Sequence, residues 1–271
     1  MPASTSALAL GNSFLFGLRQ PDVLFYNPAL TGSTEGTVVS VQHYGRPATS
    51  GSLASSLDLL GGGFGMGVQA LTYGARVAEP VETADSLFVR GLEGASEIAA
   101  TLAYGREILG LHLGVAAKAI EQRLGGNWDA TVAADVGAAV GDVDEIVVAL
   151  AVRNLGPSLS TAATDLPLPL TVTLAAATGR TPVGPLDVAG AASISRWRDG
   201  SIVPAGGLEI SYWPIAGRTI LGRLGVRRVP NGGAWPLTFG AAFIADGFTL
   251  EYALERFPDA GNSHRIGIGW R

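Results

Sequence analysis

The chain has 271 residues, of which 47% are hydrophobic, 15% are charged and 38 are glycine. A typical soluble domain has about 25% charged residues, so this composition indicates that something other than water solvates much of the surface. The net charge of −5 argues against a nucleic-acid partner, and the absence of cysteine excludes disulfides, thiolate metal sites and a cysteine nucleophile.

Lipid is the obvious alternative solvent. No apolar stretch of the sequence approaches the roughly 18 residues that a membrane-spanning helix needs, which excludes a helical membrane protein. A lipid-spanning chain without such helices must close its sheet into a barrel, because every backbone amide needs a partner and an open sheet edge leaves some without one.

Residues 1-34 come first and lack strict alternation, so we expect a short helix or a lumen plug there, ahead of a barrel over residues 35-271. The start, Met1-Pro2-Ala3-Ser4, shows no signal peptide, so we expect the mature form of an exported protein with an added initiator methionine. The N-terminal turn or plug candidates are Asp22, Asn27, Pro28 and Ala29. Proline restricts its own backbone and that of the preceding residue, which favours a turn that launches the first strand over a gate element.

The rest of the chain alternates apolar and polar residues. From Leu111 to Ala119 the odd positions are apolar, whereas His112 and Lys118 occupy even positions. Leu250 and Ile266 alternate with polar residues in the same way near the end of the chain. This period of two predicts fourteen antiparallel strands, at 37-45, 50-60, 63-73, 95-104, 108-121, 128-141, 145-154, 168-178, 185-196, 202-213, 218-228, 235-245, 247-257 and 263-271.

The connections between these segments support a transmembrane barrel of about fourteen strands. Turns after even-numbered strands are short, at Gly61-Gly62, Gly105-Arg106, 141-143, 214-217 and Asp246-Gly247, whereas the longest connections, 74-94 and 155-167, follow odd-numbered strands. Short periplasmic turns and longer outer loops are typical of bacterial barrels. Aromatic residues near strand ends suggest membrane-interface girdles, at Tyr44, Tyr73, Tyr104, Trp128, Trp197, Tyr212, Trp213, Trp235, Phe257 and Trp270.

The alternation also predicts which charged residues face the lumen. These candidates are His112, Lys118, Asp135, Asp187, Glu209, Arg223, Arg227, Glu251, Glu255 and Arg265. Opposite charges lie on neighbouring strands, and each such pair contributes only about 0.2–1 kcal/mol. The favoured interpretation is that they fill and neutralise a polar interior, and a permeation or ligand-binding role is the alternative.

Several short segments, in this order, resemble the PorV family of outer-membrane proteins, which is related to the FadL-like transporters of hydrophobic compounds. They are Asp22-Val23-Leu24-Phe25-Tyr26-Asn27-Pro28-Ala29-Leu30, Val152-Arg153-Asn154-Leu155-Gly156, Leu166-Pro167-Leu168-Pro169-Leu170, Gly207-Leu208-Glu209-Ile210, Leu224-Gly225-Val226-Arg227, Asp246-Gly247-Phe248-Thr249-Leu250-Glu251-Tyr252-Ala253 and His264-Arg265-Ile266-Gly267. The resemblance implies a fourteen-stranded barrel with an N-terminal segment in the lumen. It also implies a role in moving hydrophobic molecules or in secretion and surface attachment.

Enzymatic and metal-site signals are weak. The three histidines are far apart and no HExxH or G-x-S-x-G motif is present, so we expect no enzyme. Asp142-Val143-Asp144-Glu145 lacks the spacing and glycine of a calcium loop, and the glycine run 61-67 lacks the lysine of a phosphate loop, so we expect no metal and no cofactor.

The leading hypothesis is a bacterial outer-membrane barrel, in contact with lipid, that transports a small hydrophobic ligand or serves as a platform for a secreted or surface protein. A structural component of a larger envelope complex, without transport, is one alternative. A soluble all-β sandwich is another. No nucleic-acid partner is expected.

Overall fold

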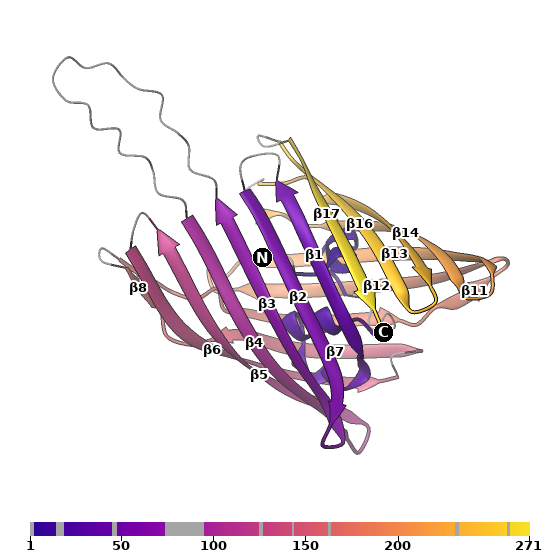
Figure 1. The fold of residues 1–271 in the computed structure, drawn as a ribbon, viewed down its shortest axis with the longest axis horizontal. Helices are drawn as coiled ribbons and strands as arrows, with labels where there is room; N and C mark the ends of the chain where they lie inside the picture. Colours follow the sequence, from indigo (N-terminus) through magenta and orange to yellow (C-terminus); the bar gives the residue numbers. More distant parts are fainter. Residues whose placement is uncertain are drawn as a thin grey trace, which may run out of the picture.

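The computed structural model describes residues 3–14, 19–44, 48–73, 95–124, 127–142, 144–161, 164–230, 233–258 and 261–271. Fourteen strands form a closed antiparallel barrel, as the sequence predicts (Figure 1). They are β1 (Gly36–Tyr44), β2 (Ala48–Leu59), β3 (Gly62–Tyr73), β4 (Ala95–Ile108), β5 (Leu111–Leu124), β6 (Asn127–Gly141), β7 (Ile146–Leu155), β10 (Thr171–Thr178), β12 (Leu186–Trp197), β13 (Ile202–Ile215), β14 (Arg218–Arg227), β15 (Leu237–Ala245), β16 (Phe248–Phe257) and β17 (Gly261–Trp270).

Two pairings close the ring. β1 pairs with β17, with Val39 opposite Ile268, and β10 pairs with both β7 and β12. The first and last strands therefore have no free edge, which excludes the soluble sandwich considered above. No helix in the described ranges is long and apolar enough to cross a membrane.

The alternation of side chains separates two environments. In β5, Gly114, Ala116 and Lys118 are buried on the inner face, whereas the odd-numbered positions from 111 to 119 are exposed on the outer face. A dry core would bury the apolar side chains of these strands. Three of them are exposed instead: Leu113 at 39%, Leu250 at 44% and Ile266 at 53%. The outer face is therefore the apolar one, which is what contact with lipid requires.

Some turns differ from the sequence-based expectation. β4 continues through Gly105 and Arg106 to Ile108, and the hairpin turn is Leu109–Gly110, two residues with positive φ, 53° and 79°. Positive φ at both central residues matches the right-handed twist of paired strands. Gly105 has another role: a Cβ there would lie 2.4 Å from the carbonyl oxygen of Pro28. The glycine lets the N-terminal segment approach the wall and does not mark a turn.

The other short turns shift by less. The connection predicted at 214-217 is the two-residue turn Ala216–Gly217, because β13 runs to Ile215, and Gly61-Gly62 is replaced by Leu60–Gly61. The connection predicted at 155-167 contains a small hairpin, β8 (Leu159–Thr161) and β9 (Thr164–Leu166). β11 (Thr181–Val183) is a three-residue strand that pairs with the beginning of β12. The predicted loop 74-94 lies outside the described residues.

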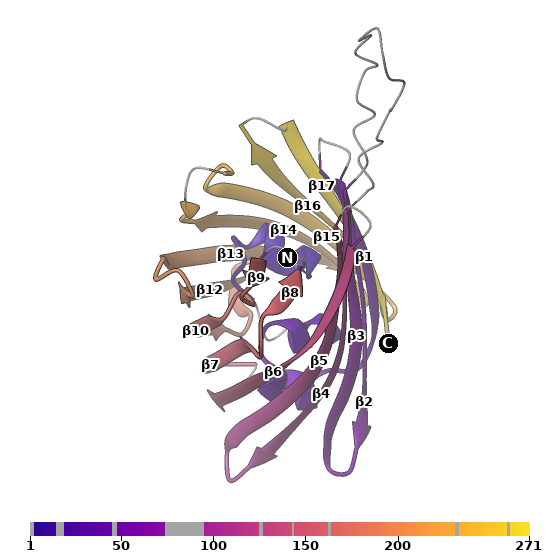
Figure 2. The ribbon, with the colours of Figure 1, turned by 90° about the vertical axis from the view of Figure 1, so that its left-hand side faces the viewer.

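The N-terminal segment lies inside the ring of strands. It contains α1 (Thr5–Ala9) and the 3-10 helices η2 (Pro21–Phe25) and η3 (Pro28–Ser33), drawn in indigo within the barrel in Figures 1 and 2. The Ser4 side chain caps α1 by accepting a hydrogen bond from Ala7 N. A five-residue helix is too short to be stable alone, so packing against the barrel wall maintains it.

The lipid-facing positions give the first prediction. Leu102 lies outward near the middle of β4, and Leu113 lies outward only two residues from a turn. We expect Leu102→Arg to destabilise the inserted barrel by about 2–4 kcal/mol and Leu113→Arg to cost less, because the penalty falls toward the membrane interface. Urea unfolding of the protein from lipid vesicles measures both changes. Equal costs for the two variants would contradict this placement in the bilayer.

Candidate lumen cavity and ion-pair network

Two ends of the barrel are distinguished by their connections. The short-turn end has the turns Leu60–Gly61, Leu109–Gly110, Ala216–Gly217 and Asp246–Gly247, and also Arg271. The loop end, opposite, has the connections 156–170, 198–201 and 228–236. These two names are used below.

Hydrogen bonds fasten the N-terminal segment to the inner wall. Thr238 Oγ1 on β15 donates to Ala9 O at 3.1 Å and accepts from Gly11 N at 3.0 Å. Across the lumen, Asn27 Nδ2 donates to Leu150 O on β7 at 3.2 Å. The wall therefore satisfies backbone and amide groups of the segment that water cannot reach.

Asn27 has a second role at the beginning of η3. Its side-chain oxygen accepts from Ala29 N at 3.0 Å, and Pro28 occupies the first position of the helix. Asn27-Pro28-Ala29 thus begins a 3-10 helix that leads into β1, while the side chain of Asn27 contacts the wall. The motif therefore lies directly before β1 and inside the ring of strands, and a role as a plug or gate element stays a prediction.

Glycines on the inner wall let the segment approach closely. A Cβ at Gly225 would lie 2.0 Å from Gly11 N, and one at Gly114 would lie 2.3 Å from Ala29 N. Real Cβ atoms do not approach backbone atoms this closely, so any side chain at either position would displace the segment. The high glycine content therefore has a specific structural use in this lumen.

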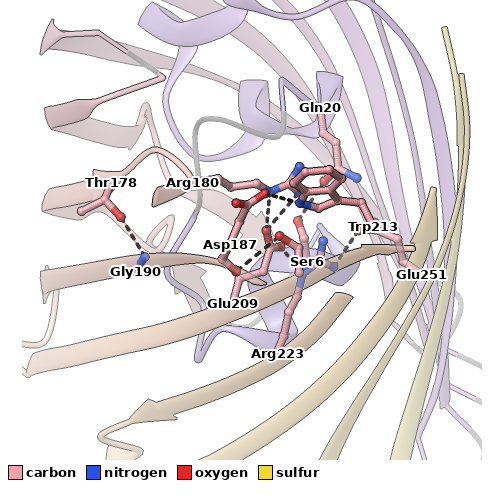
Figure 3. A network of polar contacts seen from close by, with 11 residues as sticks. Ser6, Gln20, Thr178, Arg180, Asp187, Gly190, Glu209, Trp213, Arg223 and Glu251 are labelled. Atoms are coloured by element: carbon pink, nitrogen blue, oxygen red, sulfur yellow. Dashed lines mark hydrogen bonds and ion pairs between the residues drawn. The ribbon is translucent and has the colours of Figure 1, made fainter. Parts of the chain in front are cut away.

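A buried ion-pair network lies on the wall next to the segment (Figure 3). Arg223 Nε bonds Glu209 Oε2 at 2.8 Å, and Arg223 Nη1 bonds Glu251 Oε1 at 2.7 Å. Arg180, in the connection between β10 and β11, pairs with Glu209 at 3.0 Å. The Arg180 side chain is 33% exposed, whereas Arg223 and both glutamates are buried. The network thus connects the interior with solvent at one end.

Near the same network, Asp187 accepts a hydrogen bond from Trp213 Nε1 at 3.0 Å (Figure 3). Both side chains belong to the short-turn end of β12 and β13. In the N-terminal segment close by, Ser6 Oγ donates to Gln20 Oε1 at 2.9 Å. Of these two contacts, the one between Ser6 and Gln20 is buried, whereas the one with Trp213 is exposed.

The remaining predicted lumen residues form separate contacts. Lys118 Nζ pairs with the buried Asp135 at 2.6 Å and donates to Asn154 Oδ1 at 3.0 Å. Arg265 Nη2 donates to Ala3 O at 2.6 Å and to Ser52 Oγ at 2.8 Å, which attaches the beginning of the chain to the wall. Two further predicted residues, Arg227 and Glu255, form an ion pair.

His112 lies opposite Glu107 and Ala139 at the short-turn end, apart from these clusters. The ten residues expected to face the lumen therefore divide among several structural contacts.

Asp22 is the one acidic residue of the N-terminal segment, residues 1-34, and has 1% of its surface exposed and no hydrogen-bond partner for Oδ1. Burial, reinforced by the negative charge of Glu251, raises the pKa of Asp22 from 3.8 to about 7. A hydrogen bond with Ser4 and the charges of Arg265 and Arg223 oppose this change only in part. A carboxyl with this environment changes its charge near neutral pH.

A cavity of about 910 Å³ lies in the loop half of the lumen. Its floor is formed by the N-terminal segment, at Gly11 to Phe14 and at Tyr26 and Asn27. Tyr44 and Phe257, at the loop ends of β1 and β16, line it and contact each other with ring centroids 5.9 Å apart. A volume in this range is typical of sites that enclose a small molecule.

The wall of this cavity between β7 and β12 is made of small side chains. Ala149, Ala151 and Ala175 provide apolar surface, and Thr173 and Ser195 share a hydrogen bond of 2.9 Å. Arg153 also lines the cavity and donates from Nη1 to Phe25 O at 3.1 Å. A molecule held here would meet an apolar wall, a hydroxyl-bearing wall and a cationic group.

The sequence-based list missed several of these residues. Arg153 alternates in phase with Ala149 and Ala151, so the period of two could have identified it as inward-facing. Arg180 lies in an irregular connection that no periodicity covers. Phe14 and Tyr26 belong to the N-terminal segment, where the sequence shows no alternation. The cavity lining also includes three residues that the sequence predicts for the aromatic girdles, Tyr44, Trp197 and Phe257.

A closed barrel with an apolar exterior and a polar, hydrogen-bonded interior has the architecture of bacterial outer-membrane proteins. The fold is similar to that of the toluene transporter TodX of Pseudomonas putida, with a TM-score of 0.64 and 12% identity over 99% of this chain and 96% of that one. It is also similar to a monoaromatic hydrocarbon channel, CymD, with a TM-score of 0.60 and 11% identity over 98% and 96% of the two chains. For a FadL homologue of Pseudomonas aeruginosa the TM-score is 0.58, with 10% identity over 100% and 97%.

No protein-family model and no curated protein matches the sequence. The three neighbours named above are channels or transporters rather than enzymes. They share the fold with this chain, and at 10–12% identity the likeness shows the fold alone. The resemblance to the PorV family depends on short sequence segments alone.

Proposed function

We propose that this protein resides in the bacterial outer membrane and transports a small hydrophobic molecule through the loop-end cavity. The loop end then faces the exterior and the short-turn end the periplasm, in agreement with the usual asymmetry of such barrels. The observation that carries the proposal is the cavity of about 910 Å³, lined by aromatic rings and alanines and enclosed by a lipid-facing barrel. The fold shared with hydrocarbon channels supports it.

The N-terminal segment is the plug in this proposal. It forms the floor of the cavity, and the buried network of Glu209, Arg223 and Glu251 lies beside it on the wall. A hydrophobic solute gains nothing from desolvating such charges, so it cannot displace them at low cost. The plug must shift before a solute can move beyond the cavity toward the periplasm.

The test uses two neighbouring alanines of β10. Ala175 lines the cavity, whereas Ala176 is exposed on the outer face. We expect Ala175→Trp to reduce uptake of toluene into proteoliposomes on the order of tenfold, which corresponds to a loss of about 1.4 kcal/mol in binding, because the indole occupies the space of the ligand. Ala176→Trp should leave uptake within about twofold, since it faces lipid.

Two results would contradict transport. One is the absence of uptake above protein-free vesicles by a folded sample, which would favour the structural role in an envelope complex. The other is an equal loss in the two tryptophan variants, which would show that the cavity is not the route. The platform for a secreted or surface protein stays a prediction from the PorV resemblance, and capture of such a partner by the reconstituted barrel is its test.

A further inference from the structure

We propose that the outer surface of the barrel, near the loop end of β16, β17 and β1, binds the head group of a phosphate-bearing membrane lipid. These three strands are neighbours in the sheet (Figure 1). The residues involved, called the outer cluster below, are exposed: His43, Trp235, Tyr252, Arg256 and His264. The inference concerns the lipid side of the wall, so it does not depend on transport through the lumen.

Arg256 is the charged member of the outer cluster. It lies at the loop end of β16, and its Cζ is 4.7 Å from the centroid of the Trp235 ring. Trp235 N donates to Arg256 O at 2.8 Å, which holds the tryptophan beside the strand. Among the residues that the structure describes, no carboxylate lies within ion-pair distance of Arg256. A guanidinium that rests on an indole and has no counter-ion in the described wall is available to an anion from outside.

Two histidines add hydrogen-bonding groups next to this arginine. His264 on β17 lies directly opposite His43 on β1. Tyr252 Oη and His264 Nδ1 are 2.8 Å apart, and when the hydroxyl donates, Nε2 of His264 carries the ring proton and is itself a donor. From the spacing of strands and residues, the Cα atoms of Arg256 and His43 are roughly 12 Å apart, so a head group with several oxygens spans the interval between the two side chains.

No acidic residue opposes the arginine on this part of the outer wall. The strands β15, β16, β17 and β1 lie wholly within the described residues, and their only acids are Glu251 and Glu255, both buried on the inner face. The formal charge of the whole chain is −5, so this sector differs in sign from the protein as a whole. An arginine at the membrane surface without an acidic neighbour attracts anionic lipid.

An apolar surface continues from the outer cluster toward the middle of the wall. Ile266 lies opposite Val41, and these side chains are 53% and 51% exposed. Gly51 on β2 follows Val41 in register, and a Cβ there would meet only Ser40 O, at 3.7 Å, so the surface beside Val41 is low. Acyl chains fit this strip while a phosphate fits the cluster. This combination selects a lipid over a free phosphate ion, which has no apolar part to bury.

The experiment measures lipid binding to the full chain in nonionic detergent by native mass spectrometry. Phosphatidic acid is compared with diacylglycerol that has the same acyl chains, so the two lipids differ only in the phosphate. We expect phosphatidic acid to bind on the order of tenfold more tightly, since the phosphate adds charge-assisted hydrogen bonds. Arg256→Gln should weaken phosphatidic acid about fivefold and leave diacylglycerol unchanged. The double variant His43→Gln, His264→Gln should weaken it by a smaller factor, because neutral hydrogen bonds contribute less.

Arg196→Gln is the matched control, because Arg196 is an exposed arginine at the loop end of β12, opposite Val172 and Ile202. Its strand is separated from β16 by β13, β14 and β15, which exceeds the screening length of about 10 Å, so binding of phosphatidic acid should stay within about twofold.

Three results would overturn the inference: equal binding of the two lipids, equal losses in Arg256→Gln and Arg196→Gln, and displacement of the lipid by millimolar inorganic phosphate. The last result would identify a site for the free ion. Toluene uptake by Arg256→Gln should match that of the unaltered protein, because Arg256 does not line the cavity. Failure of lipid binding therefore leaves the proposed function in place, and loss of uptake alone leaves the lipid site in place.

Discussion

Arg223→Ala is expected to destabilise the barrel by about 3–5 kcal/mol, the usual cost of breaking a buried ion pair by removing one partner. Arg223 neutralises two buried carboxylates, Glu209 and Glu251, at 2.8 and 2.7 Å. Glu209 retains Arg180 in the variant, whereas the pairing of Glu251 with Arg223 is lost outright. Denaturant unfolding of the protein in detergent or lipid gives the change in the free energy of unfolding.

An exposed pair serves as the control for that measurement. Arg123 and Glu121 form a 2.6 Å ion pair at the surface of β5. Exposed pairs contribute about 0–1 kcal/mol, so Arg123→Ala should have a small effect. If the two arginine substitutions cost the same, the network beside the plug is not buried as described.

A compensating variant separates lost charge balance from lost packing. Adding Glu251→Gln to Arg223→Ala removes the negative charge that Arg223 no longer compensates and keeps a side chain of similar size, while Glu209 retains Arg180. Most of the lost stability should return, because the penalty comes mainly from burying unpaired charge. No recovery would mean that the side chain of Arg223 acts mainly by filling space.

The barrel itself could be predicted from the sequence because the alternation of apolar and polar side chains is a local property of each strand. In each strand, side chains that face lipid alternate with side chains that face the lumen. This alternation predicts the number of strands without any knowledge of how the strands pair. The errors fell where a residue served a contact far along the chain. Gly105 looked like a turn residue, yet it lies within β4, against Pro28.

The candidate site was less predictable. Alternation places Glu209 and Arg223 on the inner face, and their pairing between adjacent strands could be expected. The cavity depends on how Phe14 and Tyr26 are positioned by an aperiodic segment, and on Arg153 contacting a backbone oxygen of that segment. The contact between Arg153 and Phe25 joins residues 128 positions apart, which no local pattern encodes.

The N-terminal segment is called seated when it occupies its position in the lumen, and the stability of this seated state is expected to depend on pH through Asp22. In the seated segment its pKa is about 7, whereas a solvated carboxyl returns to about 3.8. Because the seated state binds the proton more tightly, seating is most stable below pH 4, weakens as the pH rises from 4 to 7, and changes little above 7. The difference of about 3 pKa units corresponds to about 4 kcal/mol across that window.

Charged groups from several strands surround this carboxyl. Glu251 on β16 raises its pKa, and Arg265 on β17 and Arg223 on β14 lower it by a smaller amount. Glu251 is itself held by Arg223. The charge of ionised Asp22 is therefore only partly compensated when the segment is seated, and deprotonation should loosen the segment.

A single cysteine reports this motion, because the chain has none of its own. Val23, buried next to Asp22, becomes accessible to a maleimide only when the segment leaves its seat. The maleimide labelling rate is measured at pH 5 and at pH 8 in the Val23→Cys protein and in the same protein that also carries Asp22→Asn. The increase from pH 5 to pH 8 should be on the order of a hundredfold larger in the protein that retains Asp22, as the linkage between proton binding and seating predicts. The comparison cancels the ionisation of the thiol itself, which is common to both proteins.

The amide variant also indicates which protonation state seats the segment. Asparagine resembles the protonated acid in shape and charge, so Asp22→Asn should hold the plug at pH 8 as firmly as the unaltered segment is held at pH 5, and slow solute uptake at the higher pH. Identical pH profiles in the two proteins would show that Asp22 does not control seating. A faster uptake in Asp22→Asn would reverse the sign, since the ionised carboxylate would then be the form that Arg265 and Arg223 hold in place.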